Sequence, residues 1–111
     1  MKNRYSVVVY YGVERGNQDK LIERAVRKVS RAERIGAGTY LVNGVRDVSY
    51  GAALEITATK IASSVHEALK AARVPHHVRV IYVETGAVVH AMKGRLNPER
   101  SPRAEKGRAA P

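Results

Sequence analysis

Apolar residues at the start of the chain form a run that predicts a strand, and those that follow recur at helical spacing. Residues 5–11, YSVVVYY, are mostly β-branched or aromatic and end at Gly12, so we expect a buried or half-buried first strand there. The apolar positions after the next loop share one helix face and are Ile22, Ala25, Val26 and Val29. We expect a helix that is capped by Asn17 or Asp19 and stops at Gly36.

The middle of the chain predicts a short strand and then the longest helix. Residues 39–42 are the short strand, and a glycine-bearing loop from Asn43 to about Val48 leads into the helix. The apolar stripe of this helix, with small residues beside it, consists of Leu54, Ala58, Ile61, Ala62, Val65, Ala68 and Leu69. Such a stripe lets a helix lie close on a sheet.

Two further strands are predicted after the long helix. Pro75 marks the end of that helix, because proline disfavours helical geometry in the residue before it. Residues 78–83 and 88–92 have strand-like composition and flank residues 84–87, a turn that is typical of a hairpin. The predicted order of elements is βαβαββ.

The chain from Gly94 onward differs in composition from the part before it. Apolar residues become rare, and three of the four prolines fall in this segment. Its positive charges are Arg95, Arg100, Arg103, Lys106 and Arg108. Because such a segment cannot bury enough apolar surface to fold, we expect a folded domain at residues 1–93 and a disordered basic tail at residues 94–111.

Charge points to the class of partner. The 111 residues, a length that fits one domain, include 20 Lys and Arg against 10 Asp and Glu, a formal net charge of +10. A surface with this excess attracts polyanions. Thirteen of the basic residues are arginines, whose planar guanidinium suits phosphate contact and base stacking better than a lysine ammonium does. RNA or DNA is therefore the expected partner.

Several function classes are disfavoured by what the sequence lacks. There is no cysteine, so neither a disulfide framework nor a thiolate metal site can form. The apolar run at residues 7–11 is far shorter than the roughly 20 residues of a membrane span, and no signal-peptide pattern precedes it. We expect a soluble intracellular protein of the cytoplasm, nucleus or nucleoid, with no membrane partner.

The histidines do not form a pattern typical of catalysis or metal binding. They are His66, His76, His77 and His90. The adjacent pair lacks the i, i+4 spacing of a zinc helix, and no carboxylate falls at a partner position. The serines show no nucleophile, base and orienting group of a hydrolase. We expect no metal, no cofactor, no small-molecule substrate and no enzymatic activity.

Basic side chains near the predicted loops are the candidate contacts with nucleic acid. Arg46 falls in the loop at the strand-to-helix junction, and loops that follow parallel strands lie at one end of a sheet, so Arg15 should converge on it. Tyr50 either stacks on a base or covers the start of the helix. The full set of candidates is Arg15, Lys20, Arg24, Asn43, Arg46, Tyr50, Lys93 and Arg95. The competing interpretation is an ordinary solvated surface, stabilised by pairs such as Glu23–Arg27.

The segment that opens the long helix also carries a pattern of basic, branched and small residues. These are Gly44, Arg46, Val48, Ser49, Ala52 and Ala53. In this pattern, strongest over residues 44–62 and set in a wider likeness over residues 5–93, the chain resembles the Alba family of small nucleic-acid-binding proteins and their relatives among ribonuclease P and MRP subunits. The resemblance implies an α/β fold, a compact two-layer sandwich with two helices on one face of a four-stranded mixed sheet.

The same resemblance implies a function and an assembly. Alba-like proteins bind RNA or DNA without catalysis and with little sequence preference, in chromatin packaging or RNA metabolism, usually as homodimers or as heterodimers with a related subunit. Two other hypotheses stay open. One is a protein-interaction subunit of a ribonucleoprotein such as a ribonuclease P or MRP complex, and the other is a small ferredoxin-like enzyme with a histidine at its site.

Overall fold

The computed structural model describes residues 3–40 and 43–96. Within these residues the chain forms β1 (Tyr5–Gly12), α1 (Asp19–Arg27), β2 (Arg34–Tyr40), β3 (Val45–Ala52), α2 (Glu55–Ala71), β4 (His76–Tyr82) and β5 (Ala87–Gly94). The order of elements is therefore βαββαββ.

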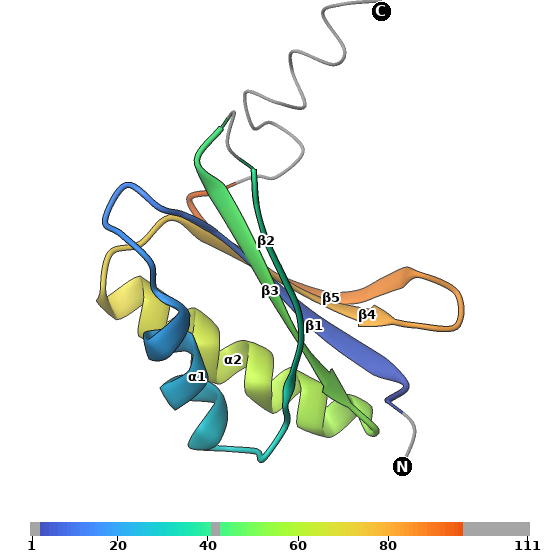
Figure 1. Ribbon diagram of the computed structural model, residues 1–111. Coiled ribbons are helices and arrows are strands. Elements are labelled where there is room, and N and C mark those ends of the chain that lie inside the picture. The colour runs from blue at the N-terminus through green and yellow to red at the C-terminus, as the bar shows by residue number, and fades with distance from the viewer. Residues whose placement is uncertain (1–2, 41–42, 97–111) are drawn as a thin grey trace, which may run out of the picture.

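The strands form one antiparallel sheet in the order β2-β3-β1-β4-β5. β1 lies at its centre, with Val9 opposite Val48 of β3 on one side and opposite Val78 of β4 on the other. Both helices cover the same face of the sheet (Figure 1). The first six elements, with β1 between β3 and β4, have the ferredoxin-like arrangement, and β5 extends the sheet beyond β4. This arrangement hosts many unrelated functions, so the fold alone assigns none.

The expected four-stranded mixed sheet with order βαβαββ is wrong, because residues 45–52 form a strand where a loop to about Val48 and then the start of the long helix were predicted. Val48 and Tyr50 alternate toward the helices, whereas Asp47 and Ser49 point to the other face. Charged and glycine residues in this segment hid the period-2 pattern of a strand that buries only one face. The extra strand also reverses the chain, so the sheet is antiparallel throughout.

The boundaries around β2 also differ from those predicted. α1 ends at Arg27, and Gly36, expected as its stop, lies within β2 opposite Ser49. The strand expected at residues 39–42 instead spans Arg34–Tyr40, and residues 41–42 lie outside the described part of the chain. Two glycines in seven residues lower the strand propensity of β2, so pairing with β3 rather than local preference defines it.

Other predicted elements are confirmed with small shifts in their ends. β1 and α2 match the first strand and the long helix, and β4 and β5 pair antiparallel as the predicted hairpin. Gly86 sits in the hairpin turn with a φ of 74°, a conformation that favours glycine. Residues 97–111, most of the predicted tail, lie outside the described residues.

The core lies between the helix layer and the sheet. β1 contributes Val7, Val9 and Tyr11, which alternate toward the helices and are fully buried. The helices bury Ile22, Ala25, Val26, Ala58, Ile61, Ala62, Val65 and Leu69. Where the helices meet, Ser64 donates a hydrogen bond to the carbonyl of Ala25 at 2.6 Å. The small side chains at this contact let the two helices approach closely.

Candidate nucleic-acid interface

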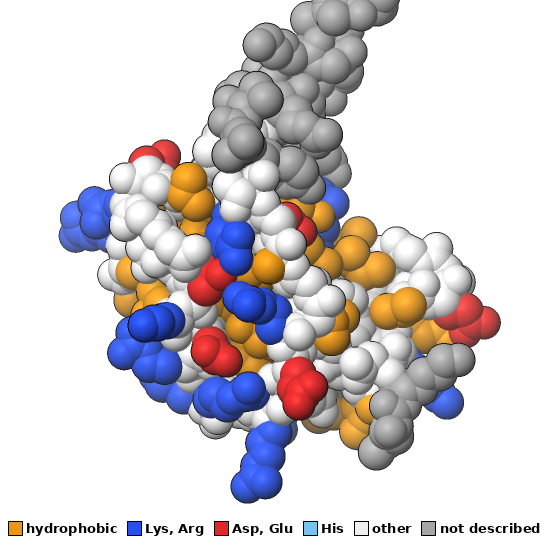
Figure 2. Space-filling view, in the orientation of Figure 1, with side chains coloured by type: hydrophobic (Ala, Val, Ile, Leu, Met, Phe, Trp, Pro, Cys, Tyr) orange, Lys and Arg blue, Asp and Glu red, His pale blue; other side chains and the backbone are white. Residues whose placement is uncertain are grey.

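Helix α1 presents positively charged side chains on its solvent face. Lys20, Arg24 and Lys28 follow one another at intervals of four residues, so they lie along one side of the helix. All three are exposed, and among the described residues none of them has an ion pair. We call these three residues the α1 band. Lys and Arg side chains gather over α1 in the space-filling view (Figure 2).

The α1 band lowers the stability of the helix that carries it. Like charges four residues apart repel one another by about 0.2–0.5 kcal/mol per pair. Lys20 also lies in the first turn, near the positive end of the helix dipole. Of the two carboxylates on α1, Asp19 pairs with Arg46 and Arg34, and Glu23 is paired at 3.8 Å with Arg27, so both have partners outside the band. The band is therefore a concentrated positive charge that the fold leaves unneutralised.

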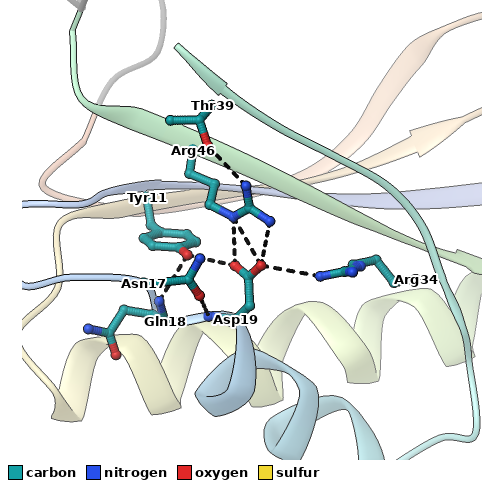
Figure 3. A network of polar contacts seen from close by, with 7 residues as sticks. All are labelled: Tyr11, Asn17, Gln18, Asp19, Arg34, Thr39 and Arg46. Carbon is teal, nitrogen blue, oxygen red and sulfur yellow. Dashed lines mark hydrogen bonds and ion pairs between the residues drawn. The ribbon is translucent and has the colours of Figure 1, made fainter. Parts of the chain in front are cut away.

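Arg46, the residue expected to bind phosphate, has a different role in the structure. Its side chain points from β3 toward the start of α1, where its Nε donates to Oδ1 of Asp19 at 2.9 Å (Figure 3). A second nitrogen, Nη2, binds the other oxygen of Asp19, and Nη1 donates to Thr39 Oγ1 at 2.9 Å. Only 18% of the Arg46 side chain and 16% of the Asp19 side chain are exposed.

Tyr11 and Arg34 complete this group around Asp19. The Tyr11 hydroxyl donates to Asp19 Oδ1 at 2.6 Å and accepts from the backbone amide of Gln18 at 2.9 Å. Arg34, which is more exposed, approaches Asp19 Oδ2 to 3.2 Å. We call Tyr11, Asp19, Arg34 and Arg46 the Asp19 cluster. It ties the first turn of α1 to β1, β2 and β3.

The Asp19 cluster shifts the proton affinity of its members. Burial acts to raise the pKa of Asp19, but the hydrogen bonds from Arg46 and Tyr11 outweigh it and hold that pKa below its usual value. The bond to Asp19 raises the pKa of Arg46. Burial, helped by the bond to Asp19, raises the pKa of Tyr11 to about 12. At neutral pH, Asp19 and Arg46 are therefore a charged pair, and Arg46 adds little net charge to the surface.

Tyr50 does not lie where it could stack on a base. Its ring points into the core from β3 and is 2% exposed, and burial raises its pKa. It packs with the core residues of β1 and the helices instead. The interpretation of Tyr50 as a stacking residue is corrected by this burial, since stacking requires an open ring face.

The loops after β1 and before β3 meet at one end of the sheet. The amide of Val13 donates to the carbonyl of Gly44 at 2.9 Å. This juxtaposition arises because β1 and β3 are antiparallel neighbours, and not from the parallel crossover that was expected. Arg15 is exposed in the first loop. Asn43 is half-buried, and its Oδ1 accepts from the amide of Val45 at 3.1 Å, so it shapes the turn into β3.

Lys93 and Arg95 belong to a second basic region. They lie at the end of β5, where they line a surface pocket of about 440 Å³ together with Lys70 and Arg73 from the end of α2. We call it the basic pocket. Lys70 and Arg73 were not among the candidates from sequence, although His66, Lys70 and Arg73 recur at the spacing of one helix face. That spacing was the signal available for finding the pocket.

Five of the eight candidates fall in three places, whereas Arg15 and Asn43 lie in the loops at one end of the sheet and Tyr50 lies in the core. Lys20 and Arg24 lie in the α1 band, Lys93 and Arg95 line the basic pocket, and Arg46 lies in the Asp19 cluster. Over the described ranges, no group of three or more His, Asp or Glu side chains is placed to hold a metal ion. In the same residues no helix is both long and apolar enough to cross a membrane.

Comparisons of the chain with protein-family models, with curated proteins and with solved structures found no match. The resemblance to Alba proteins stays a prediction, and the sheet it implied is not the one observed. The surface of this chain alone therefore carries the indications of its function.

Proposed function

We propose that the protein is a non-catalytic, intracellular nucleic-acid-binding protein that holds the phosphate backbone of RNA or DNA on the α1 band. The observation that carries the proposal is the row of Lys20, Arg24 and Lys28 at intervals of four residues, exposed and without acidic partners in the described structure. The like charges of this row repel one another in the free protein, and a bound polyanion would neutralise them.

The dimensions of the band suit a phosphate backbone. Lys20 and Lys28 are eight residues apart, which is about 12 Å along a helix axis. Each strand of duplex DNA carries one phosphate per roughly 3.4 Å of the axis, so the three cations of the band would span about three to four phosphates of one strand. Contacts of this kind fix position without distinguishing bases, so binding should be largely independent of sequence.

A single-charge substitution on the band provides the test. Arg24→Ala should weaken binding to unrelated RNA and DNA sequences alike and reduce the slope of log affinity against log salt by about 1. Arg4→Ala is the matched control: it also removes one exposed cation, but one beside Tyr82 and Glu84. Affinity would be measured by fluorescence anisotropy across a salt series for duplex DNA and single-stranded RNA.

The outcomes separate the interface from general charge. A larger loss for Arg24→Ala than for Arg4→Ala supports the band as the interface. Equal losses for the two variants, or an affinity of the unaltered protein that does not depend on salt, would contradict it.

A further inference from the structure

The basic pocket is formed by two segments that are far apart in sequence, residues 66–76 and residues 93–95. His66 and Lys70 come from α2, Arg73 and Val74 follow that helix, and the remaining lining comes from the start of β4 and the end of β5. The β-strand residues that line it are His76, Lys93, Gly94 and Arg95. Four of the lining residues are Lys or Arg and none is Asp or Glu. The pocket thus concentrates positive charge in a concave site.

The charge in the pocket exceeds what the end of α2 requires. Cations near a helix C-terminus stabilise its partial negative charge, which accounts for Lys70 and Arg73. The last carbonyls of α2 are also occupied, since the amides of Ala72 and Val74 bind those of Ala68 and Leu69. Arg95, just after β5, binds the carbonyl of Arg73 beyond the helix end, whereas Lys93 comes from β5 and the helix end gives no reason for its presence.

The backbone around the pocket is held in unusual conformations. Arg73 has a φ of 57° at the C-terminal cap of α2, where the amides of Arg73 and Val74 bind the carbonyls of Lys70 and Leu69. Arg95 has a φ of 69° and no such cap to explain it, in the left-handed region that costs a non-glycine residue roughly 1–2 kcal/mol. Arg95 Nη2 donates to the carbonyl of Arg73 at 3.2 Å, which joins the two segments. A Cβ on Gly94 would lie 2.0 Å from the nearest ring atom of His76, so the strand approaches the ring closely enough to require glycine. Strain of this kind collects at binding sites.

Two histidines at the pocket form an ordered pair. His76 is buried, and its Nδ1 lies 2.7 Å from the carbonyl of Val74, so that nitrogen carries the proton. Burial lowers the pKa of His76 and keeps the ring neutral, so its Nε2 accepts from Nδ1 of His66 at 2.8 Å. This orientation fixes the ring of His66, a residue that lines the pocket, and Nε2 of His66 has no partner among the described residues.

We propose that the basic pocket binds a phosphomonoester group, with Lys70, Arg73, Lys93 and Arg95 as its cationic contacts. A phosphomonoester carries a charge of about −1.5 to −2 at neutral pH and three terminal oxygens, whereas a phosphodiester carries one charge and continues on both sides. A concave site rich in cations matches a terminal group of higher charge. This site is separate from the α1 band, and the group it binds belongs either to the end of a polynucleotide or to a small phosphorylated molecule.

Titrations followed by NMR test the ligand class. The probes are inorganic phosphate, a nucleoside 5′-monophosphate, the same nucleoside without phosphate, and a dinucleoside phosphodiester. We expect inorganic phosphate and the nucleoside monophosphate to shift the resonances of His66 and Gly94 saturably. The unphosphorylated nucleoside and the phosphodiester should leave these resonances unchanged. Equal binding of the phosphodiester and the monophosphate, or no saturable shift with either monoester, would overturn the proposal.

Variants test which side chains make the contact. Lys93→Ala should weaken monophosphate binding tenfold or more, as expected for the loss of a hydrogen bond between charged groups. Arg4→Ala, which removes one exposed cation elsewhere, should not. Lys70→Ala tests the pocket from α2 and should also weaken binding. Unchanged affinity in both pocket variants, with folding verified by circular dichroism, would exclude the site.

A last pair of titrations identifies the source of the phosphate. An oligonucleotide with a 5′- or 3′-terminal phosphate would be compared with its hydroxyl-ended counterpart and with the free nucleotide. Tighter binding of the phosphorylated oligonucleotide than of its hydroxyl-ended counterpart identifies a polynucleotide end, and equal binding of those two with saturable binding of the free nucleotide identifies a small molecule. Either result supports the pocket. The effect of Arg24→Ala on backbone binding is independent of these outcomes, so the two proposals can fail separately.

Discussion

Asp19 binds side chains from three strands, β1, β2 and β3, more than any other carboxylate among the described residues. It begins α1 and accepts hydrogen bonds from Tyr11 of β1 and from Arg46 of β3, at positions 8 and 27 residues away. The pair of Asp19 and Arg46 removes one arginine from the surface available to nucleic acid. At the scale of single residues, we therefore assign Arg46 a role in stabilising the fold rather than in binding nucleic acid.

Substitution of Asp19 should test that assignment. Asp19→Asn leaves the Arg46 guanidinium without its counter-ion, and we expect it to lower the free energy of unfolding by about 1–3 kcal/mol in urea. Glu23→Gln, which removes an exposed partner of Arg27, should change it by less than about 0.5 kcal/mol. Because the folded-state pKa of Asp19 is lowered, its contribution is present above its unfolded pKa and is lost as pH falls through the folded one.

Asp19→Asn should therefore show a weaker loss of stability in acid than the unaltered protein. Arg46→Ala should destabilise in the same way while leaving affinity for nucleic acid unchanged. If Arg46→Ala instead weakened binding without affecting stability, the guanidinium would have to leave Asp19 for phosphate, and the cluster would be part of the interface.

At the scale of elements, α1 has an apolar face that stabilises the fold and a charged face whose side chains repel one another. Its buried face carries Ile22, Ala25 and Val26, which pack it against α2 and the sheet, and its exposed face carries the α1 band. A helix of nine residues has little stability of its own, so packing and the Asp19 cluster must hold it against the repulsion within the band. Substitutions in the α1 band should therefore weaken binding to nucleic acid without lowering the free energy of unfolding.

Arg24→Glu tests this expectation. The substitution replaces two like-charge pairs, one with Lys20 and one with Lys28, by two pairs of opposite charge at the same four-residue spacing. Arg24 also lies in the last turn of α1, where a negative charge is unfavourable by about 0.3–1 kcal/mol. The two effects offset, so we expect the free energy of unfolding to change by less than about 0.5 kcal/mol. The same substitution should reduce affinity for nucleic acid more than Arg24→Ala does. A variant that loses both stability and affinity would indicate that Arg24 supports the fold, contrary to its exposed position.

At the scale of the whole molecule, positive charge is in excess on more than one surface. The α1 band lies on the helix layer, whereas the basic pocket lies where the end of α2 meets the end of β5. With a formal net charge of +10, mutual repulsion opposes the folded state and attraction to polyanions favours the bound one.

Salt should consequently act on stability and on binding in opposite directions. Raising the salt concentration from roughly 20 to roughly 200 mM shortens the Debye length and screens repulsion, so the melting temperature of the free protein should rise. Affinity for nucleic acid should fall over the same range, because the release of counterions on binding becomes less favourable. Scanning fluorimetry and anisotropy on one sample series would compare the two, and a melting temperature that fell with salt would mean that attractive pairs dominate the surface.

The sequence by itself determined those features that depend on neighbours along the chain. The apolar runs of β1 and the β4–β5 hairpin and the 3.6-residue period of α2 are local patterns, and each predicted its element. The excess of arginine likewise predicts a class of partner without any knowledge of the fold. Local periodicity is set by which face of an element is buried, and it survives in the sequence for that reason.

Only the tertiary structure decided what depends on residues far apart. Arg46 belongs to a strand and faces the helix layer because Asp19 neutralises it there, which no pattern within residues 45–52 reveals. The basic pocket likewise requires α2 and β5 to meet. Strand pairing and ion pairing are long-range contacts whose free energy depends on geometry, so the sequence supplied the basic residues while the fold determined which of them stay exposed.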